Sequence, residues 1–444
     1  MQDTICLLND SFPPLIDGVA NTVVNYAKHL PEEGLKSLVI TPDHNDAEDQ
    51  KFEYPVIRYP SIKTQMVEGY PAGVPFSPKI ARATESENIT LLHSHCPVVS
   101  TLVARELRQI RNVPIVMTYH TKFDIDIAHI VKNTHLQEVC KKVLLSNISA
   151  CDEIWAVSKG AGENLRALGY EGDYIVMPNG VDFPREKASA EKVDAVTGTY
   201  DLPRNVPVYL FVGRMMWYKG IRIILDALAK MKIQSQDFRM VFIGDGDDRQ
   251  DIEQYAEKCS IADRCIFTGV IHDRAELQAW YTRANLFLFP STYDTNGLVV
   301  REAAACSLAS VLIQGSCAAE GVIDGRNGFL IEENPESLSA CLSSLRTDTM
   351  RRVGEAAGNE LYLSWADAVK MAVDRYHTVI DRYRCGYYPK HRKPSEAILK
   401  MNGELMEALA KTSKLRHDKY GDDLIFKLKH LKNELSNNDT KKEE

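Results

Sequence analysis

Two carboxylates eight residues apart stand at a junction between a strand, a loop and a helix. Asp294 lies in the polar loop after the apolar run 286–289, and Glu302 lies one turn into an Ala-rich helix that we expect to start near Leu298. The start of a helix exposes backbone N–H groups that suit a phosphate, whereas carboxylates suit the hydroxyls of a sugar. Taken alone, the stretch is equally compatible with an ordinary polar loop that carries a surface Glu.

Two cations occupy a second stretch of the same kind, residues 208–230. Arg214 and Lys219 flank the expected helix start, Gly213 allows a tight turn, and Gly220 lets the backbone approach a ligand closely. Two cations beside a helix start are suited to a diphosphate.

Strands and helices alternate along both halves of the chain, which predicts parallel, doubly wound sheets with ligands at the carboxyl ends of the strands. In the first half the predicted strands are Thr4–Leu8, Ser37–Thr41, Val56–Tyr59, Thr90–His93 and Pro114–Tyr119. His120 follows the last of these strands and so falls at such an end. A lone His at this place is more often structural than catalytic.

Together the two ligand-binding stretches resemble the nucleotide-sugar-binding half of family 4 glycosyltransferases, in which G-R-x4-K-G is followed by E-x7-E. In this chain Asp294 stands where the family usually has the first Glu. The resemblance implies a GT-B fold: an α/β protein with two Rossmann-like, doubly wound domains that face a cleft, and a C-terminal helical extension. We expect an acceptor-side domain at 1–190, a nucleotide-sugar domain at 200–360, and crossover helices with a charged tail at 361–444. The polar stretch 183–206 shows no clear periodicity, and we place the linker there.

The resemblance also assigns roles to individual residues. The catalytic residues would be His120, which contacts the donor sugar, together with Asp294, Arg214 and Lys219. The donor-binding residues would be Gly18, Gly213, Val270, Asn296, Gly297, Leu298 and Glu302. Because Asp is one methylene shorter than Glu, its carboxylate reaches roughly 1.5 Å less far. We expect this difference to affect which sugar is bound more than which class of reaction is catalysed.

Composition limits the other function classes. A chain of 444 residues with 44% hydrophobic and 26% charged residues suits two globular domains, and a net charge of -8 argues against general nucleic-acid binding. The ten Cys form no CxxC pair, so we expect reduced thiols in a cytoplasm. His93, His95 and Cys96 are too closely spaced for a usual zinc site, and we expect no metal. No apolar run reaches the length of a membrane span, so any membrane contact would be peripheral, on the inner face of the plasma membrane.

The resemblance implies a retaining glycosyltransferase that needs no cofactor. We expect it to move a hexose, glucose, from a nucleotide diphosphate sugar, UDP-glucose, to the hydroxyl of a lipid such as diacylglycerol. Three alternatives stay open: an acceptor that is a soluble sugar or a cell-wall glycan precursor, a non-catalytic relative that only binds nucleotide sugar, and a nucleotide-sugar epimerase of the same fold. Residues 75–82, residues 122–148 and the basic, Tyr-containing segment 382–393 are candidates for membrane contact, and each is at least equally compatible with an ordinary protein surface.

Overall fold

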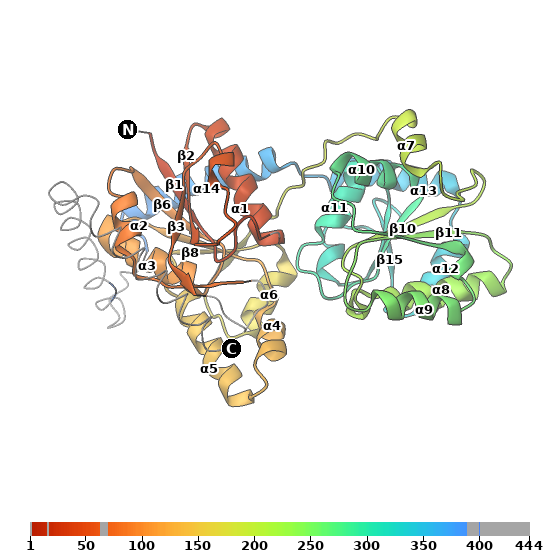
Figure 1. Cartoon of the computed structure of the whole chain (residues 1–444), viewed down its shortest axis with the longest axis horizontal. Helices are drawn as coiled ribbons and strands as arrows, with labels where there is room; N and C mark the ends of the chain where they lie inside the picture. The colour runs from red at the N-terminus through yellow and green to blue at the C-terminus, as the bar shows by residue number, and fades with distance from the viewer. Residues whose placement is uncertain (1, 16, 63–69, 389–398, 400–444) are drawn as a thin grey trace, which may run out of the picture. The chain divides into compact units, whose positions relative to one another are not determined.

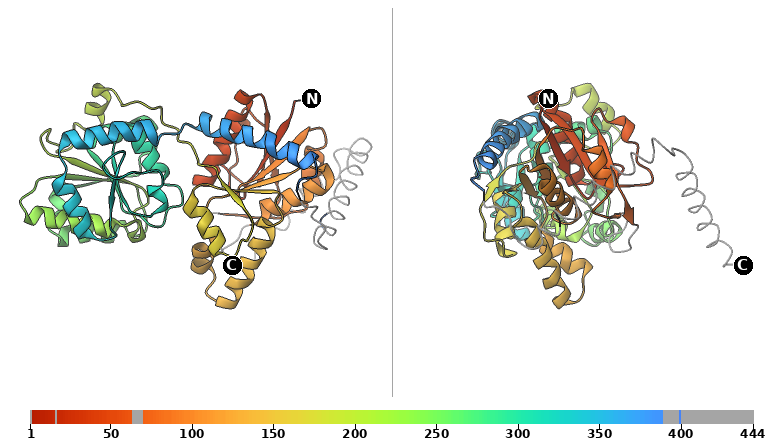
Figure 2. Two further views of the ribbon diagram at one scale, coloured as in Figure 1. Left: turned by 180° about the vertical axis from the view of Figure 1, so that it is seen from behind. Right: turned by 90° about the vertical axis from the view of Figure 1, so that its left-hand side faces the viewer.

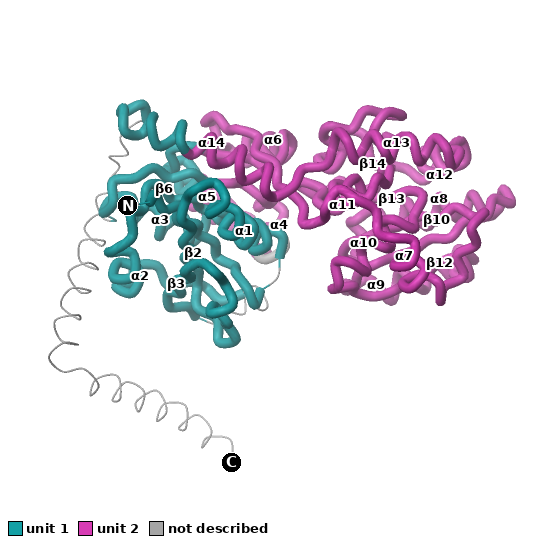
Figure 3. The backbone as a smooth tube through the Cα atoms, turned by 90° about the horizontal axis from the view of Figure 1, so that it is seen from above, with its two compact units in different colours: residues 1–117, 146–153, 377–444 teal, residues 118–145, 154–376 magenta. Residues whose placement is uncertain are grey.

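The structure is a computed structural model that describes residues 2–15, 17–62, 70–388 and 399. The chain divides into two compact units (Figure 3). One unit comprises residues 1–117, 146–153 and 377–444, and the other comprises residues 118–145 and 154–376. The units interleave along the sequence, and the predicted domain boundaries near residues 190 and 360 stay a prediction.

The first sheet contains seven strands in the order β3-β2-β1-β6-β7-β8-β9 within the described part of the chain. The strands are β1 (Thr4–Leu8), β2 (Lys36–Pro42), β3 (Val56–Tyr59), β6 (Ile89–Ser94), β7 (Ile115–Tyr119), β8 (Glu153–Ala156) and β9 (Tyr174–Val176). β1 pairs in parallel with β2 and β6, and both of its faces are buried. Two short strands, β4 (Ser61–Ile62) and β5 (Ala72–Gly73), pair separately in an antiparallel hairpin.

The second sheet has six parallel strands in the order β12-β11-β10-β13-β14-β15. They are β10 (Val208–Val212), β11 (Arg239–Ile243), β12 (Cys265–Gly269), β13 (Leu286–Phe289), β14 (Ser310–Ile313) and β15 (Phe329–Ile331). The direction in which the chain adds strands changes between β10 and β13. From β10 the chain continues to β11 on one side, and from β13 it continues to β14 on the other side. Ligands of doubly wound sheets bind at this kind of switch point, next to the carboxyl ends of the strands.

Helices cover both faces of each sheet (Figures 1 and 2). In the first half of the chain they are α1 (Gly18–His29), α2 (Pro78–Ala83), α3 (Val99–Arg111), α4 (Phe123–Ile130), α5 (Thr134–Ile148) and α6 (Lys159–Ala167). In the second half they are α7 (Ala190–Thr197), α8 (Ile221–Ile233), α9 (Arg249–Lys258), α10 (Arg274–Arg283), α11 (Leu298–Ala305), α12 (Pro335–Ser344), α13 (Thr347–Glu360) and α14 (Trp365–Arg384). None of the described helices has the length and apolar composition needed to cross a membrane.

These elements confirm the predicted α/β class and all five strands predicted in the first half, with ends that differ by at most one residue. One helix was missed. The polar stretch 183–206 contains α7, where the side chain of Ser189 accepts a hydrogen bond from the backbone N–H of Lys192. α7 packs against α10, a tertiary contact that its weak apolar periodicity did not indicate.

The described part of the predicted tail lies against the protein's own surface. The hydroxyl of Tyr388 donates to Glu153 Oε2 at 3.3 Å, and the guanidinium of Arg382 lies 4.0 Å from the same carboxylate and 4.9 Å from the centre of the Tyr387 ring. Arg382 and Tyr388 thus contact their own unit, whereas Tyr387 is 68% exposed. Lys390, Arg392 and Lys393 lie outside the described residues.

Loops at the carboxyl edge of the second sheet approach one another closely because glycines stand at the points of contact. Gly220 has a φ of 78°, and a Cβ at this position would lie 1.9 Å from the carbonyl oxygen of Pro290, which follows β13. A Cβ on Gly244, after β11, would lie 2.0 Å from the carbonyl oxygen of Gly213, after β10. Side chains at these positions would force the three loops apart.

Replacing Gly220 with Ala should therefore destabilise this unit by about 3 kcal/mol or more, because a left-handed backbone and a clash with a carbonyl oxygen add together. Urea unfolding followed by circular dichroism measures the change. Gly315→Ala is the matched control, since Gly315 has a φ of 80° but nothing within 4 Å of the added Cβ, and it should cost about 1 kcal/mol. Equal losses in the two variants would contradict the close contact with Pro290.

Candidate donor site

Lys219 and Asp294, predicted from separate stretches, form an ion pair. Lys219 Nζ lies 2.7 Å from Asp294 Oδ1, and the lysine side chain is only 9% exposed. The other carboxylate oxygen, Oδ2, accepts a hydrogen bond of 2.6 Å from the hydroxyl of Ser291. Since each carboxylate oxygen has two lone pairs, Asp294 can still accept a hydrogen bond from a ligand.

Three aromatic rings surround the ammonium group of Lys219. Its Nζ lies 5.4 Å from the centre of the Tyr293 ring, 5.6 Å from Tyr218 and 5.9 Å from Phe289. Aromatic faces attract a cation and exclude water, so they strengthen the interaction of Lys219 with any anion that reaches it. None of these rings was singled out from the sequence, because their arrangement depends on the contact between the two loops.

Arg214 differs from Lys219 in being exposed and in having no ion pair or side-chain hydrogen bond with the described residues. It lies directly after β10, one residue beyond Gly213, on the same loop as Lys219. This loop therefore presents one buried, paired cation and one exposed cation. An exposed guanidinium can turn toward a phosphate without breaking an existing interaction.

The start of α11 is open to an anion. Gly297 precedes it with a φ of 58°, and no side chain caps the first turn, so the backbone N–H groups of Leu298 and Val299 have no helical partner. The side-chain amide nitrogen of Asn296 is buried and has no hydrogen-bond partner among the described residues. These donors, close in sequence to Asp294, fit the predicted phosphate-binding helix start.

Glu302 is held by two partners that the sequence did not indicate. Arg274 Nη2 donates to Oε1 at 2.8 Å, and the hydroxyl of Tyr281 donates to Oε2 at 3.0 Å. Arg274 in turn stacks on Phe183, with its guanidinium carbon 4.0 Å from the ring centre. Burial raises the pKa of the Glu302 carboxyl above its ordinary value, while the charge of Arg274 acts in the opposite direction. Arg274 thus favours the carboxylate form, which accepts hydrogen bonds from ribose hydroxyls.

His120 is connected to the Asp294 loop through its main chain. Thr295 Oγ1 donates to the carbonyl oxygen of His120 at 2.6 Å, and Lys122 Nζ donates to the carbonyl oxygen of Thr292 at 3.0 Å. His120 is buried, with 7% of the residue exposed. Ser158, at the start of α6, donates to the carbonyl oxygen of Thr295. The structure therefore places His120 beside the loop that carries Asp294, within the same compact unit.

Two other predicted residues belong to other segments of the chain. Val270 follows β12 and is 51% exposed, next to Gly269, whose carbonyl oxygen accepts from the N–H of Gly244. Gly18 belongs to the other unit. There, Asp17 already accepts the N–H groups of Val19 and Ala20 at the start of α1. The roles of Val270 at a base and of Gly18 at a diphosphate stay predictions.

No group of three or more metal-ligating side chains occurs among the described residues. The rings of His93 and His95 instead pack against each other, with their centres 4.0 Å apart. The centre of each ring lies 5.4 Å from the centre of the Tyr26 ring. Arg214 and Lys219 carry positive charge on the loop after β10, and their role in neutralising a phosphate stays a prediction.

The link between Arg274 and Glu302 leads to a pH-dependent prediction. In the variant Arg274→Gln the pKa of Glu302 should rise further, because burial is then opposed only by the hydroxyl of Tyr281. Isothermal titration of UDP between pH 5 and pH 9 should show affinity lost at a higher pH in the variant than in the parent protein. Arg351→Gln, which removes an exposed arginine paired with Glu355, is the control and should leave the profile unchanged. A profile that does not move in Arg274→Gln would contradict the predicted role of Glu302.

Two family models match successive parts of the chain. Residues 16–185 match Glycosyltransferase Family 4, and residues 198–359 match Glycosyl transferases group 1. The second match covers Arg214, Lys219, Asp294 and Glu302.

Relatives and solved structures agree with these matches. The GDP-mannose-dependent alpha-mannosyltransferase of Corynebacterium glutamicum is 25% identical over 338 residues, which cover 74% of this chain and 76% of the relative. The alpha-monoglucosyldiacylglycerol synthase of Acholeplasma laidlawii is 26% identical over 346 residues, or 75% of this chain and 85% of the relative. The structure of Anabaena HepE in complex with UDP has a TM-score of 0.67 at 18% identity and covers 85% of this chain and all of that one.

The fold, the order of the two motif stretches and the matches to both halves agree. The chain is a glycosyltransferase of the GT-B fold; it is similar to Glycosyltransferase Family 4 over residues 16–185 and to Glycosyl transferases group 1 over residues 198–359, and it resembles the diacylglycerol glucosyltransferases.

Proposed function

We propose that this glycosyltransferase moves glucose from UDP-glucose to the hydroxyl of a diacylglycerol-type lipid, with retention of the anomeric configuration. The observation that carries the donor half of the proposal is the ion pair between Lys219 and Asp294. A group that binds phosphate and a group that accepts sugar hydroxyls lie 2.7 Å apart, which suits the bond between a sugar and a diphosphate.

The charges of the site suit departure of the diphosphate. As the bond between sugar and phosphate breaks, negative charge develops on the leaving oxygen, and preorganised donors stabilise it. In our proposal Lys219, Arg214 and the N–H groups at the start of α11 provide this stabilisation. Glu302 accepts hydrogen bonds from the ribose, and Asp294 from the sugar. His120 contacts the sugar, and the leaving phosphate takes the proton of the acceptor hydroxyl on the same face.

The lipid half of the proposal is supported by an apolar stripe on α5. Leu136, Val139 and Val143 are 50%, 44% and 56% exposed, and their spacing of three and four residues puts them on one face of the helix. Exposed Lys132 and Lys142 accompany this stripe. An apolar face flanked by lysines suits the interface of an anionic bilayer, where burial of each aliphatic side chain contributes about 1.5–3 kcal/mol. The name of the Acholeplasma laidlawii relative points to the same class of acceptor.

A soluble sugar or a cell-wall glycan precursor is the second candidate acceptor. It is favoured by the variety of the relatives, which include a D-inositol 3-phosphate glycosyltransferase that is 28% identical over 60% of this chain. The donor site would be the same in both cases. The dependence of turnover on a lipid surface distinguishes them.

Replacing Asp294 with Ala should lower sugar transfer by about 100-fold or more, because a transition-state contact to the sugar is lost. UDP should still bind, since Lys219 is then free to pair with the diphosphate. Kinetics with UDP-glucose and isothermal titration with UDP measure the two effects. Lys219→Ala is the complementary variant and should weaken binding of UDP. If Asp294→Ala abolished UDP binding, the assignment of Asp294 to the sugar would be wrong.

The acceptor is tested by UDP release from UDP-glucose with and without vesicles that contain diacylglycerol and an anionic phospholipid. Release should require the vesicles. It should fall about tenfold when Leu136, Val139 and Val143 are all replaced by Ser. Ile233→Ser, which changes an apolar side chain on α8 that is 84% exposed, is the control and should not alter release. Equal release with a soluble sugar and no vesicles would establish the second candidate instead.

A further inference from the structure

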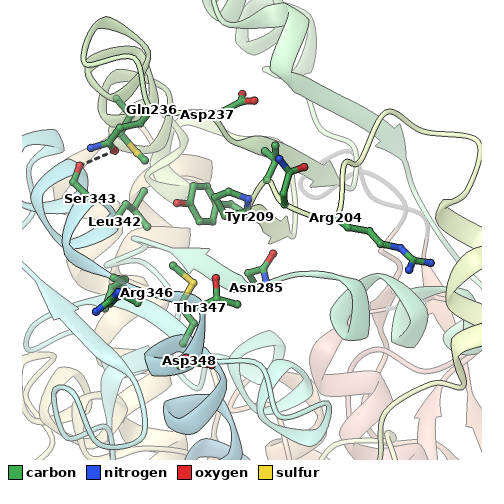
Figure 4. A pocket seen from close by; sticks show the side chains of 16 residues that line it. Arg204, Tyr209, Gln236, Asp237, Asn285, Leu342, Ser343, Arg346, Thr347 and Asp348 are labelled. Atoms are coloured by element: carbon green, nitrogen blue, oxygen red, sulfur yellow. Dashed lines mark hydrogen bonds between the residues drawn. The ribbon is translucent and has the colours of Figure 1, made fainter.

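A pocket of about 510 Å³ lies at the amino ends of β10 and β13, on the edge of the second sheet opposite to Lys219 and Asp294 (Figure 4). Its walls come from residues 204–209, the end of α8, Asn285 and the start of α13. This volume falls within the roughly 300–1,000 Å³ of small-molecule sites. None of these residues takes part in the donor site, so the pocket needs an explanation of its own.

The phenol of Tyr209 occupies the middle of this pocket (Figure 4). The side chain is 1% exposed, yet its hydroxyl has no hydrogen-bond partner among the described residues and is not sealed from the pocket. Burial raises the pKa of this hydroxyl, so it remains protonated and can donate. A nearly buried donor without a protein partner is stabilised when an oxygen of a ligand accepts from it.

Asn285 presents a second donor. Its Oδ1 accepts the backbone N–H of Val208 at 2.8 Å, so the orientation of the amide is fixed and the Nδ2 group faces away from that bond. The Nδ2 group has no partner among the described residues. By contrast, Gln236 and Ser343 on the far wall already bond to each other at 2.9 Å. Tyr209 and Asn285 therefore present free donors to the middle of the pocket, which suits a ligand with acceptor oxygens, while the carboxylate of Asp348 remains an acceptor at the rim.

Two arginines give the rim of the pocket a positive charge. Arg204 and Arg346 lie on opposite sides, with their guanidinium groups directed outward (Figure 4), and neither pairs with any described residue. Burial lowers the pKa of the nearby Arg283, and the positive charge of Arg204 adds to this effect. Arg346 immediately precedes α13, whose first turn has no side-chain cap. Its free N–H groups and Arg346 together form a place for an anion.

We infer that this pocket binds a small phosphate ester whose body carries hydroxyl groups. The phosphate lies at Arg346 and the start of α13, and Arg204 turns inward from the opposite rim. Tyr209 and Asn285 donate to oxygens of the body. Asp348, an exposed carboxylate in the first turn of α13, accepts from its hydroxyls.

The proposal is tested by isothermal titration of the full chain with ribose 5-phosphate, with inorganic phosphate as the comparison. Ribose 5-phosphate should bind at least tenfold more tightly than inorganic phosphate. The variant Tyr209→Phe, which removes only the hydroxyl, should bind it about fivefold more weakly, and Arg204→Gln with Arg346→Gln at least tenfold more weakly. Arg352→Gln, an exposed arginine of α13 outside the pocket, is the matched control and should bind like the parent protein.

Lys219→Ala separates this pocket from the proposed donor site, which also attracts phosphates. Binding that survives in Lys219→Ala and is lost in the double arginine variant supports the inference, whether or not the proposed reaction is correct. The inference is overturned if binding is lost in Lys219→Ala alone, if the double variant binds like the parent, or if inorganic phosphate binds as tightly as ribose 5-phosphate. The inference is also overturned if ribose 5-phosphate shows no binding at about 10 mM, a concentration on the order of the weakest dissociation constants of interest.

Discussion

The donor site depends on the burial of one ammonium group. Taking a charge out of water costs several kcal/mol unless a partner compensates it, and Lys219 is 9% exposed. Asp294 supplies the countercharge, Ser291 orients Asp294, and three aromatic rings surround the ammonium. This arrangement requires the loop after β10 to touch the loop after β13, which is possible because Gly220 has no side chain next to Pro290.

Much of the fold follows from local sequence patterns. Buried parallel strands read as continuous apolar runs, and this is why β1, β3 and β13 could be placed to the residue. The polar loops at their carboxyl ends then brought Lys219 and Asp294 to the same edge of one sheet, as doubly wound topology requires. α7 was missed because its apolar face is defined by contact with α10 and not by a strong pattern of its own.

The hydrogen-bond partners of the predicted residues could not be predicted from local sequence patterns. Arg274 reaches Glu302 from another helix, 28 positions earlier, and Thr295 reaches the main chain of His120 across 175 positions. Such pairs are set by tertiary packing, and neither end carries a local signal. The bond to His120 uses a carbonyl oxygen, a group that every residue has. Single-sequence reasoning therefore singled out residues at the carboxyl ends of the strands, but not the partners that hold those residues in place.

The carboxylate of Asp294 lies beside the ammonium group of Lys219, where a phosphate would also bind. The carboxylate therefore competes with a phosphate for the same cation. A phosphate that approaches Lys219 must displace a carboxylate, and that carboxylate is then left in a partly buried place without its cation. A bare diphosphate offers no replacement partner, whereas a sugar diphosphate offers a hydroxyl to Asp294 at the same moment as a phosphate to Lys219. In the proposed reaction the site thereby discriminates between an intact donor and the nucleotide that remains after transfer, a difference that favours departure of the spent nucleotide.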